Sequence, residues 1–117
     1  MDFIQLKNIF ENNNSFLITT HVNPDADAIG SESAVYYILK KLGKQVHIVN
    51  NSKLPYNLEF LDIDKKVETY LPEKHDKLFN EVDVLVCLDF NRSDRIVKMQ
   101  QSFLASKKLK VCIDHHQ

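Results

Sequence analysis

Residues 16–27 read Phe16-Leu17-Ile18-Thr19-Thr20-His21-Val22-Asn23-Pro24-Asp25-Ala26-Asp27, an apolar run followed at once by a histidine and two carboxylates. A short apolar run that contains β-branched residues and ends at turn-forming residues is typical of a buried β-strand. The Asn-Pro pair favours a turn, and Asp27 is placed to cap a helix that follows it. Taken alone, the segment is equally consistent with a simple turn closed by an aspartate cap.

The same arrangement recurs twice in the chain. Residues 82–89 read Val82-Asp83-Val84-Leu85-Val86-Cys87-Leu88-Asp89, and residues 109–116 read Leu109-Lys110-Val111-Cys112-Ile113-Asp114-His115-His116. Strand-like and helix-like segments alternate along the chain, which is typical of βαβ units and a mainly parallel sheet. Because ligand sites of open α/β sheets lie outside the carboxyl ends of the strands, we expect the polar residues after the three runs to meet at one edge.

The remaining pattern predicts a single three-layer, Rossmann-like α/β domain, a mainly parallel sheet flanked by helices. Strands are expected over residues 16–20, 45–50, 82–88 and 109–113, and helices over residues 3–10, 27–42 and 93–106. Between residues 54 and 80 the pattern is weaker and indicates a short helix near 56–61, an extended piece near 67–70 and one or two helical turns after Pro72. In the helix that Gly43 ends, the predicted buried stripe is Ala34, Val35, Ile38, Leu39 and Leu42.

The composition limits the function classes. A net charge of −1, from 15 Lys plus Arg and 16 Asp plus Glu, gives no basic surface for binding a nucleic-acid duplex. The only cysteines, Cys87 and Cys112, lie in apolar runs and are predicted to be buried and reduced. There is no signal-peptide pattern and no apolar stretch near the ~20 residues of a membrane span. These features predict a cytoplasmic protein without a membrane partner.

The clustered carboxylates and imidazoles predict a metal site. Carboxylates gathered at one place repel one another, and a polyvalent cation removes that penalty. Oxygen and imidazole ligands without thiolates favour Mn²⁺, Mg²⁺ or a similar cation over a structural zinc. Two histidines and three aspartates are too many for one ion with an open position, so two ions about 3.5–4 Å apart fit better. Phosphate-ester hydrolysis is the chemistry that most often uses such a pair.

Three further side chains, His47, His75 and Arg95, lie outside the three polar segments. His47 and His75 have no partner pattern and are predicted to be structural or exposed. Arg95 is compatible with binding a substrate phosphate and with pairing to a nearby carboxylate.

The three polar segments together resemble a known family. His21-x-Asn23-Pro24-Asp25-x-Asp27-x-x-Gly30-Ser31, then Asp89 after an apolar strand, then Asp114-His115-His116, are similar in order and spacing to the first three motifs of the DHH phosphoesterase superfamily. The resemblance covers residues 16–116. The Asn-Pro form of the first motif is most similar to the nanoRNase/pAp phosphatase branch, while family II pyrophosphatases and exopolyphosphatases share the superfamily pattern.

The resemblance implies a cofactor of two Mn²⁺ ions, with Mg²⁺ or Co²⁺ as alternatives. It places His21, Asp25 and Asp89 on one ion, and Asp27, Asp89 and His115 on the other, so that Asp89 bridges the two. It further implies that His116 faces the substrate phosphate and that Asp114 orients the histidine pair. Gly30 and Ser31 are expected to open a helix whose N-terminus binds an anion. The resemblance also favours Arg95 as a residue that binds the substrate.

The family also has elements that are absent from these 117 residues. They are a fourth motif with a further aspartate ligand, a linker and a C-terminal DHHA1 domain. We therefore expect residues 1–117 to be the N-terminal part of a DHH phosphoesterase domain, truncated at its C-terminal end. The expected substrates are short oligoribonucleotides and 3′-phosphoadenosine 5′-phosphate (pAp), and a homodimer of the full-length protein stays open. The alternatives are a pyrophosphatase or exopolyphosphatase, or a non-catalytic nucleotide- or metal-binding module.

Overall fold

Five parallel strands form the centre of the structure, a computed structural model that describes residues 3–20, 26–51, 53–62, 64–88 and 100–113. The strands are β1 (Ser15–Thr20), β2 (Gln45–Asn50), β3 (Val67–Thr69), β4 (Val84–Leu88) and β5 (Leu109–Ile113). Their order in the sheet is β3-β2-β1-β4-β5, and every neighbouring pair is parallel. The predicted mainly parallel sheet is confirmed.

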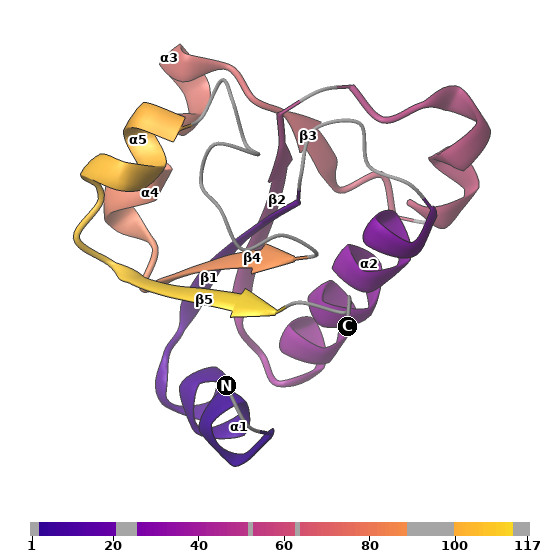
Figure 1. The fold of residues 1–117 in the computed structure, drawn as a ribbon. Helices are drawn as coiled ribbons and strands as arrows, with labels where there is room; N and C mark the ends of the chain where they lie inside the picture. The colour runs from indigo at the N-terminus through magenta and orange to yellow at the C-terminus, as the bar shows by residue number, and fades with distance from the viewer. Residues whose placement is uncertain (1–2, 21–25, 52, 63, 89–99, 114–117) are drawn as a thin grey trace.

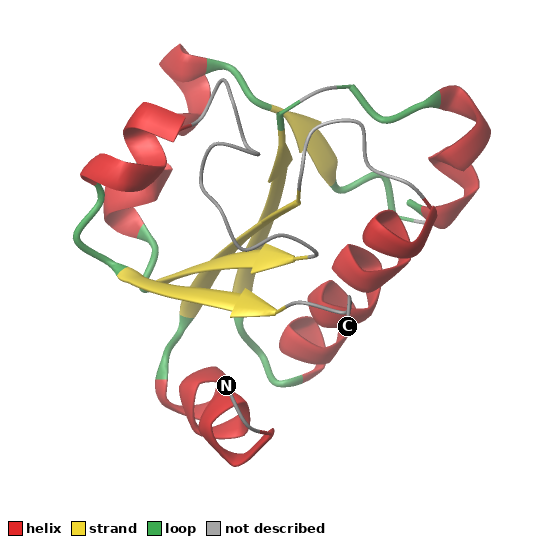
Figure 2. Cartoon of the chain, in the orientation of Figure 1, coloured by secondary structure: helices red, strands yellow, loops and turns green. Residues whose placement is uncertain are grey.

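Helices cover both faces of this sheet, as Figures 1 and 2 show. One face carries α1 (Phe3–Asn12) and α2 (Ala26–Lys41), and the other carries α3 (Pro72–His75), α4 (Leu78–Glu81) and α5 (Gln100–Ala105). A 3₁₀ helix, η1 (Tyr56–Leu61), lies beside α2, where the Ser33 hydroxyl donates to the Leu61 carbonyl at 2.9 Å. The three-layer α/β class is therefore confirmed. No helix among these described elements is long and apolar enough to cross a membrane.

The strand period of two distributes the apolar residues between two cores. Leu17 and Leu85 contribute to the core under α3, α4 and α5, whereas Phe16, Ile18 and Val86 contribute to the core under α1 and α2. Every residue of β4 is buried. A strand covered on both faces has no polar side, which explains the continuous apolar run of its sequence.

The buried face of α2 differs from the predicted stripe. Ile38 and Leu42 are 52% and 48% exposed and line a groove with Phe3, Leu6 and Phe10 of α1. The residues that α2 buries are Ala28, Ile29, Glu32, Tyr36 and Leu39. The predicted stripe therefore combined residues of two different surfaces of α2, one that faces the sheet and one that faces α1. The predicted stop is confirmed, since Gly43 follows the helix with a φ of 80°.

The structure tests the predictions made for the two cysteines and for His75. Cys87 is buried as predicted, but Cys112 is exposed, because β5 is the outermost strand of the described sheet. His75 is structural and buried: its Nδ1 accepts the Leu71 backbone N–H at 2.9 Å, and its Nε2 lies 2.8 Å from Glu68. Since Nδ1 accepts, Nε2 carries the proton and donates to the carboxylate. This hydrogen bond lowers the pKa of Glu68.

Candidate functional site

The strands that precede the three predicted motifs end side by side. Thr20 of β1 is in register with Leu88 of β4, and Leu88 is in register with Ile113 of β5. The next residues along the chain are His21, Asp89 and Asp114. The chain leaves β1 toward β2 on one side and returns through β4 on the other, so the junction of β1 and β4 is the switch point of the sheet. Ligand sites of open α/β sheets lie at this point.

Three of the ten predicted site residues belong to the described part of the chain. They are Asp27, Gly30 and Ser31, all on α2. Asp27 is exposed in the first turn of α2, where a negative charge is favourable at the helix N-terminus. The other seven lie outside the described residues, namely His21, Asp25, Asp89, Arg95, Asp114, His115 and His116.

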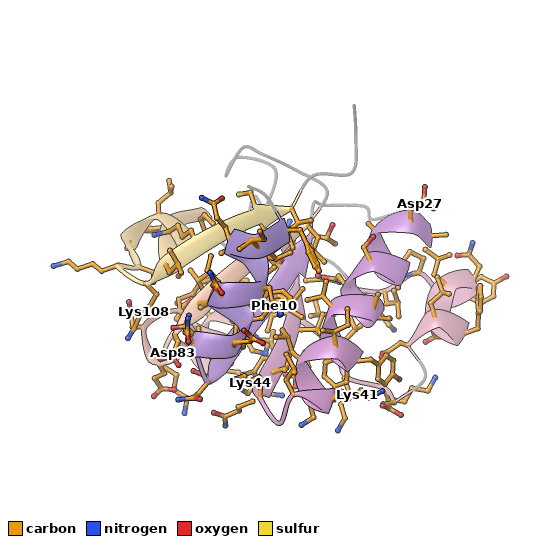
Figure 3. The ribbon with its side chains drawn as sticks, turned by 90° about the horizontal axis from the view of Figure 1, so that it is seen from below. Phe10, Asp27, Lys41, Lys44, Asp83 and Lys108 are labelled. Carbon is orange, nitrogen blue, oxygen red and sulfur yellow. The ribbon has the colours of Figure 1, made fainter. Side chains whose placement is uncertain are left out.

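Asp27 lies at the edge of the sheet to which the strands point. Figure 3 shows it at the end of α2 remote from Lys41, and on the opposite side of the molecule from Lys44 and Asp83. Lys44 and Asp83 directly precede β2 and β4, so they mark the amino ends of the strands. The carboxylate of Asp27 is therefore on the same edge as the strand ends that lead into the other motifs.

Gly30 and Ser31 lie deeper in the helix than expected. Because α2 begins at Ala26, Asp27 is in its first turn rather than at a cap before it, and Gly30 and Ser31 occupy the second turn, half-buried. The expectation that they open the helix is wrong.

A hydrogen bond ties the ends of β1 and β4 together. The Thr20 hydroxyl, which is fully buried, donates to the Leu88 carbonyl at 2.9 Å. The bond joins the residues immediately before His21 and Asp89, across the switch point. Its geometry is that of a normal O–H···O hydrogen bond.

Replacing Thr20 with valine is expected to lower the free energy of unfolding by about 1 kcal/mol, since valine keeps the shape and removes one buried hydrogen bond. Denaturant titration measures this loss. Thr69→Val, at an exposed position that ends β3, is the matched control and is expected to change stability by less than about 0.5 kcal/mol. Equal effects of the two substitutions would show that the Thr20 hydrogen bond contributes nothing.

Sequence reasoning missed a buried polar pair at the same edge. Glu32 of α2 and Asn50 of β2 are 0% and 1% exposed, and the Asn50 amide Nδ2 donates to Glu32 Oε1 at 2.8 Å. Burial raises the pKa of Glu32 to about 8; the hydrogen bond from Asn50 opposes this shift, and the charge of Asp62 adds to it. A usable signal was present in the sequence: Ala28 and Tyr36 flank Glu32 at a spacing of four, on the buried side of the helix.

The one predicted metal ligand among the described residues, Asp27, is of a type that suits a hard cation. Asp27 offers carboxylate oxygens at the exposed edge of the sheet, the ligand type that Mg²⁺ and Mn²⁺ prefer. No cluster of three or more potential ligands occurs among the described residues. Asp27 is the one predicted metal ligand that belongs to these described residues.

Known proteins have similar sequences and a similar fold. The family model described as "DHH family, N-terminal domain" matches residues 15–117. The chain is 38% identical over 100 residues to the bifunctional oligoribonuclease and PAP phosphatase NrnA of Thermus thermophilus. The matched region is 85% of this chain and 27% of that protein. The structure resembles the crystal structure of an exopolyphosphatase-related protein from Bacteroides fragilis, with a TM-score of 0.89 and 36% identity over 97% of this chain and 34% of that one.

The chain thus spans between a quarter and a third of the length of these relatives. The family match begins at the first residue of β1 and includes all five strands and all three predicted motifs. The resemblance inferred from the motifs is confirmed, and the chain belongs to the DHH family, whose N-terminal domain occupies residues 15–117.

Proposed function

We propose that this protein is a metal-dependent phosphoesterase that hydrolyses short oligoribonucleotides and pAp. The observation that carries the proposal is the matched register of Thr20, Leu88 and Ile113, because it starts the three motif segments from neighbouring positions at the switch point. The name of the Thermus thermophilus relative, an oligoribonuclease and PAP phosphatase, supports the choice of substrate.

In this proposal five side chains hold two Mn²⁺ ions. His21, Asp25 and Asp89 would hold one ion, and Asp27, Asp89 and His115 would hold the other. When bound, the ions would lower the pKa of the attacking water and neutralise the charge on the phosphoryl oxygens. The exposure of Asp27, in the first turn of α2, supports its part in this proposal.

The remaining predicted residues act on the substrate. His116 donates a proton toward the phosphate ester, and Asp114 orients the two histidines. Arg95 and the second turn of α2, with Gly30 and Ser31, bind the substrate phosphate. A Cβ atom at Gly30 would meet no described atom within 4 Å. Packing against the described residues therefore gives no reason for a glycine that costs a helix about 1 kcal/mol relative to alanine, and close approach of a ligand would supply one.

A second candidate function is the hydrolysis of inorganic phosphoanhydrides. It is favoured by the exopolyphosphatase-related relative, whose fold matches at a TM-score of 0.89. A third candidate, a binding module without catalysis, is disfavoured by the sequence, because none of the three motifs carries a substitution at a predicted ligand.

The substrate preference provides the test. With Mn²⁺, the full-length protein is expected to release phosphate from pAp with a kcat/KM roughly a hundredfold or more above that for pyrophosphate or polyphosphate, because a site that binds the nucleoside discriminates against substrates without it. Chelation by EDTA should abolish the activity and added Mn²⁺ should restore it. Faster hydrolysis of pyrophosphate or polyphosphate would favour the second function. Tight binding of pAp without turnover would favour the third.

A further inference from the structure

Glu32 and Asn50 leave one oxygen atom each without a hydrogen-bond donor. Asn50 Nδ2 donates to Glu32 Oε1 at 2.8 Å, but Glu32 Oε2 and Asn50 Oδ1 are buried and have no partner in the described part of the protein. Both atoms are acceptors when the glutamate is ionised, so the pair then lacks a donor for either. Leaving buried acceptors unpaired is costly in free energy.

One proton removes this deficit. If Oε2 carries a hydrogen atom, the acid can donate to Asn50 Oδ1 while the amide donates to Oε1, so that the two planar groups pair through two opposed hydrogen bonds. The charged groups nearby favour this form. Asp62, the residue after η1, accepts the backbone N–H groups of Lys66 and Val67 at 2.8 and 3.2 Å, and its charge raises the pKa of Glu32. Tyr36, one turn further along α2, carries no charge in its ordinary form.

The electrostatics of burial agree with this assignment. Removal from water raises the pKa of Glu32 to about 8, despite the opposing hydrogen bond from Asn50. The neutral acid is then the main form at pH 7, where an exposed glutamate would be ionised.

The pair joins two elements that build the candidate site. Glu32 directly follows Gly30 and Ser31 on α2 and lies in the turn after Asp27. Asn50 is the last residue of β2, the strand next to β1, and its backbone carbonyl accepts Tyr70 N–H at 2.8 Å, which fixes it to the segment after β3. A rigid link between these positions would fix the start of α2 against the carboxyl edge of the sheet.

We propose that Glu32 is a positioning residue of the site: as a neutral acid it pairs with Asn50 through two opposed hydrogen bonds, and this pair sets the first two turns of α2, with Asp27, against the sheet. The positioning role rests on the proposed metal site. The neutral pair itself does not, so the two parts are tested by separate measurements.

Infrared spectroscopy of the full-length protein tests the neutral pair. The wild type at pH 7 is expected to show the carbonyl band of a protonated carboxyl group, and Glu32→Gln is expected to remove it. Glu59→Gln, the same change at an exposed position on η1, should leave the band in place. Absence of the band from the wild type, or its persistence in Glu32→Gln, would overturn the assignment.

The pH dependence of unfolding gives an independent readout. A folded-state pKa raised above the ordinary value of 4.5 to about 8 means that the stability of the wild type, relative to Glu32→Gln, falls as the pH rises from 4.5 to 8 and then levels off. Glutamine can pair with Asn50 in both directions without titrating. A constant difference between the two proteins across this range would contradict a neutral Glu32.

Binding of Mn²⁺, measured by calorimetry, tests the positioning role. Asn50→Leu removes the pairing group and is expected to weaken Mn²⁺ binding about tenfold, the lower end of the range for loss of an outer-shell partner. Glu32→Gln should keep the affinity of the wild type. Equal loss in both variants would show that a charged Glu32 is needed, and no loss in Asn50→Leu would refute positioning. If the wild type binds no Mn²⁺, the proposed function and the positioning role both fail, while the infrared result still decides the pair.

Discussion

Asp89→Asn is expected to lower kcat for pAp hydrolysis by about a thousandfold or more, because a lost metal interaction removes several kcal/mol of transition-state stabilisation and each 1.36 kcal/mol is a factor of ten. Asp89 follows β4, the strand between β1 and β5, and is the residue that we place on both ions. Asparagine keeps the shape and removes the charge. Asp25→Asn removes a ligand of one ion and is expected to cost less.

Steady-state kinetics of the full-length protein, together with its Mn²⁺ content, measure this effect. Asp64→Asn is the matched control, the same substitution at an exposed position after η1, and should leave both quantities unchanged. Near-normal turnover of Asp89→Asn with intact metal content would remove Asp89 from the site. A larger loss in Asp25→Asn would show that Asp89 does not bridge the ions.

The sequence predicts the long strands of this fold well. β2 and β5 have the predicted bounds, 45–50 and 109–113, and β1 differs from its prediction by one residue. β1 and β4, in the middle of the sheet, are covered on both faces, which explains their largely apolar sequences. The short elements between residues 54 and 80 are less visible. β3 has three residues, and α3 and α4 have four each, too few to show a period.

These short elements depend on contacts that no local pattern contains. The side chain of Asp76, at the end of α3, accepts hydrogen bonds from the hydroxyl groups of Tyr70 and of Ser102 on α5. His75 is held by Leu71 and Glu68. The bonds to Glu68 and Ser102 join this region to β3 and α5, and the second of them spans 26 residues of sequence. Tertiary structure therefore determines this region, which explains why its prediction was vague.

The site was predictable in its chemistry but not in its arrangement. The motifs indicate which residues lie at the carboxyl edge, since all parallel strands end there. They do not give the strand order, and it is this order that makes the ends of β1 and β4 neighbours. The pairing of Glu32 with Asn50 was missed for a similar reason. A glutamate in a helix is most often exposed, and its partner here lies 18 residues away on a strand.

We expect the core between the sheet and the helices α3, α4 and α5 to contribute strongly to stability. Phe79→Ala should lower the free energy of unfolding by about 3–5 kcal/mol, the usual cost of removing a buried aromatic ring. Phe79, on α4, is fully buried, packs edge-to-face against Tyr70 with ring centroids 6.3 Å apart, and belongs to the core that contains Leu17 and Leu85. Those two residues belong to β1 and β4, the strands that lead to His21 and Asp89.

Phe60→Ala supplies the comparison, because the same side chain is 71% exposed on η1. Its removal is expected to change the free energy of unfolding by less than about 0.5 kcal/mol, as for most surface substitutions. Denaturant titration of both variants measures the difference. Since a domain of this size has roughly 5–15 kcal/mol of stability in total, Phe79→Ala alone would remove a large share of it. Similar losses in the two variants would mean that α4 does not seal the core, and that β1 and β4 are held in register by the α1 and α2 face alone.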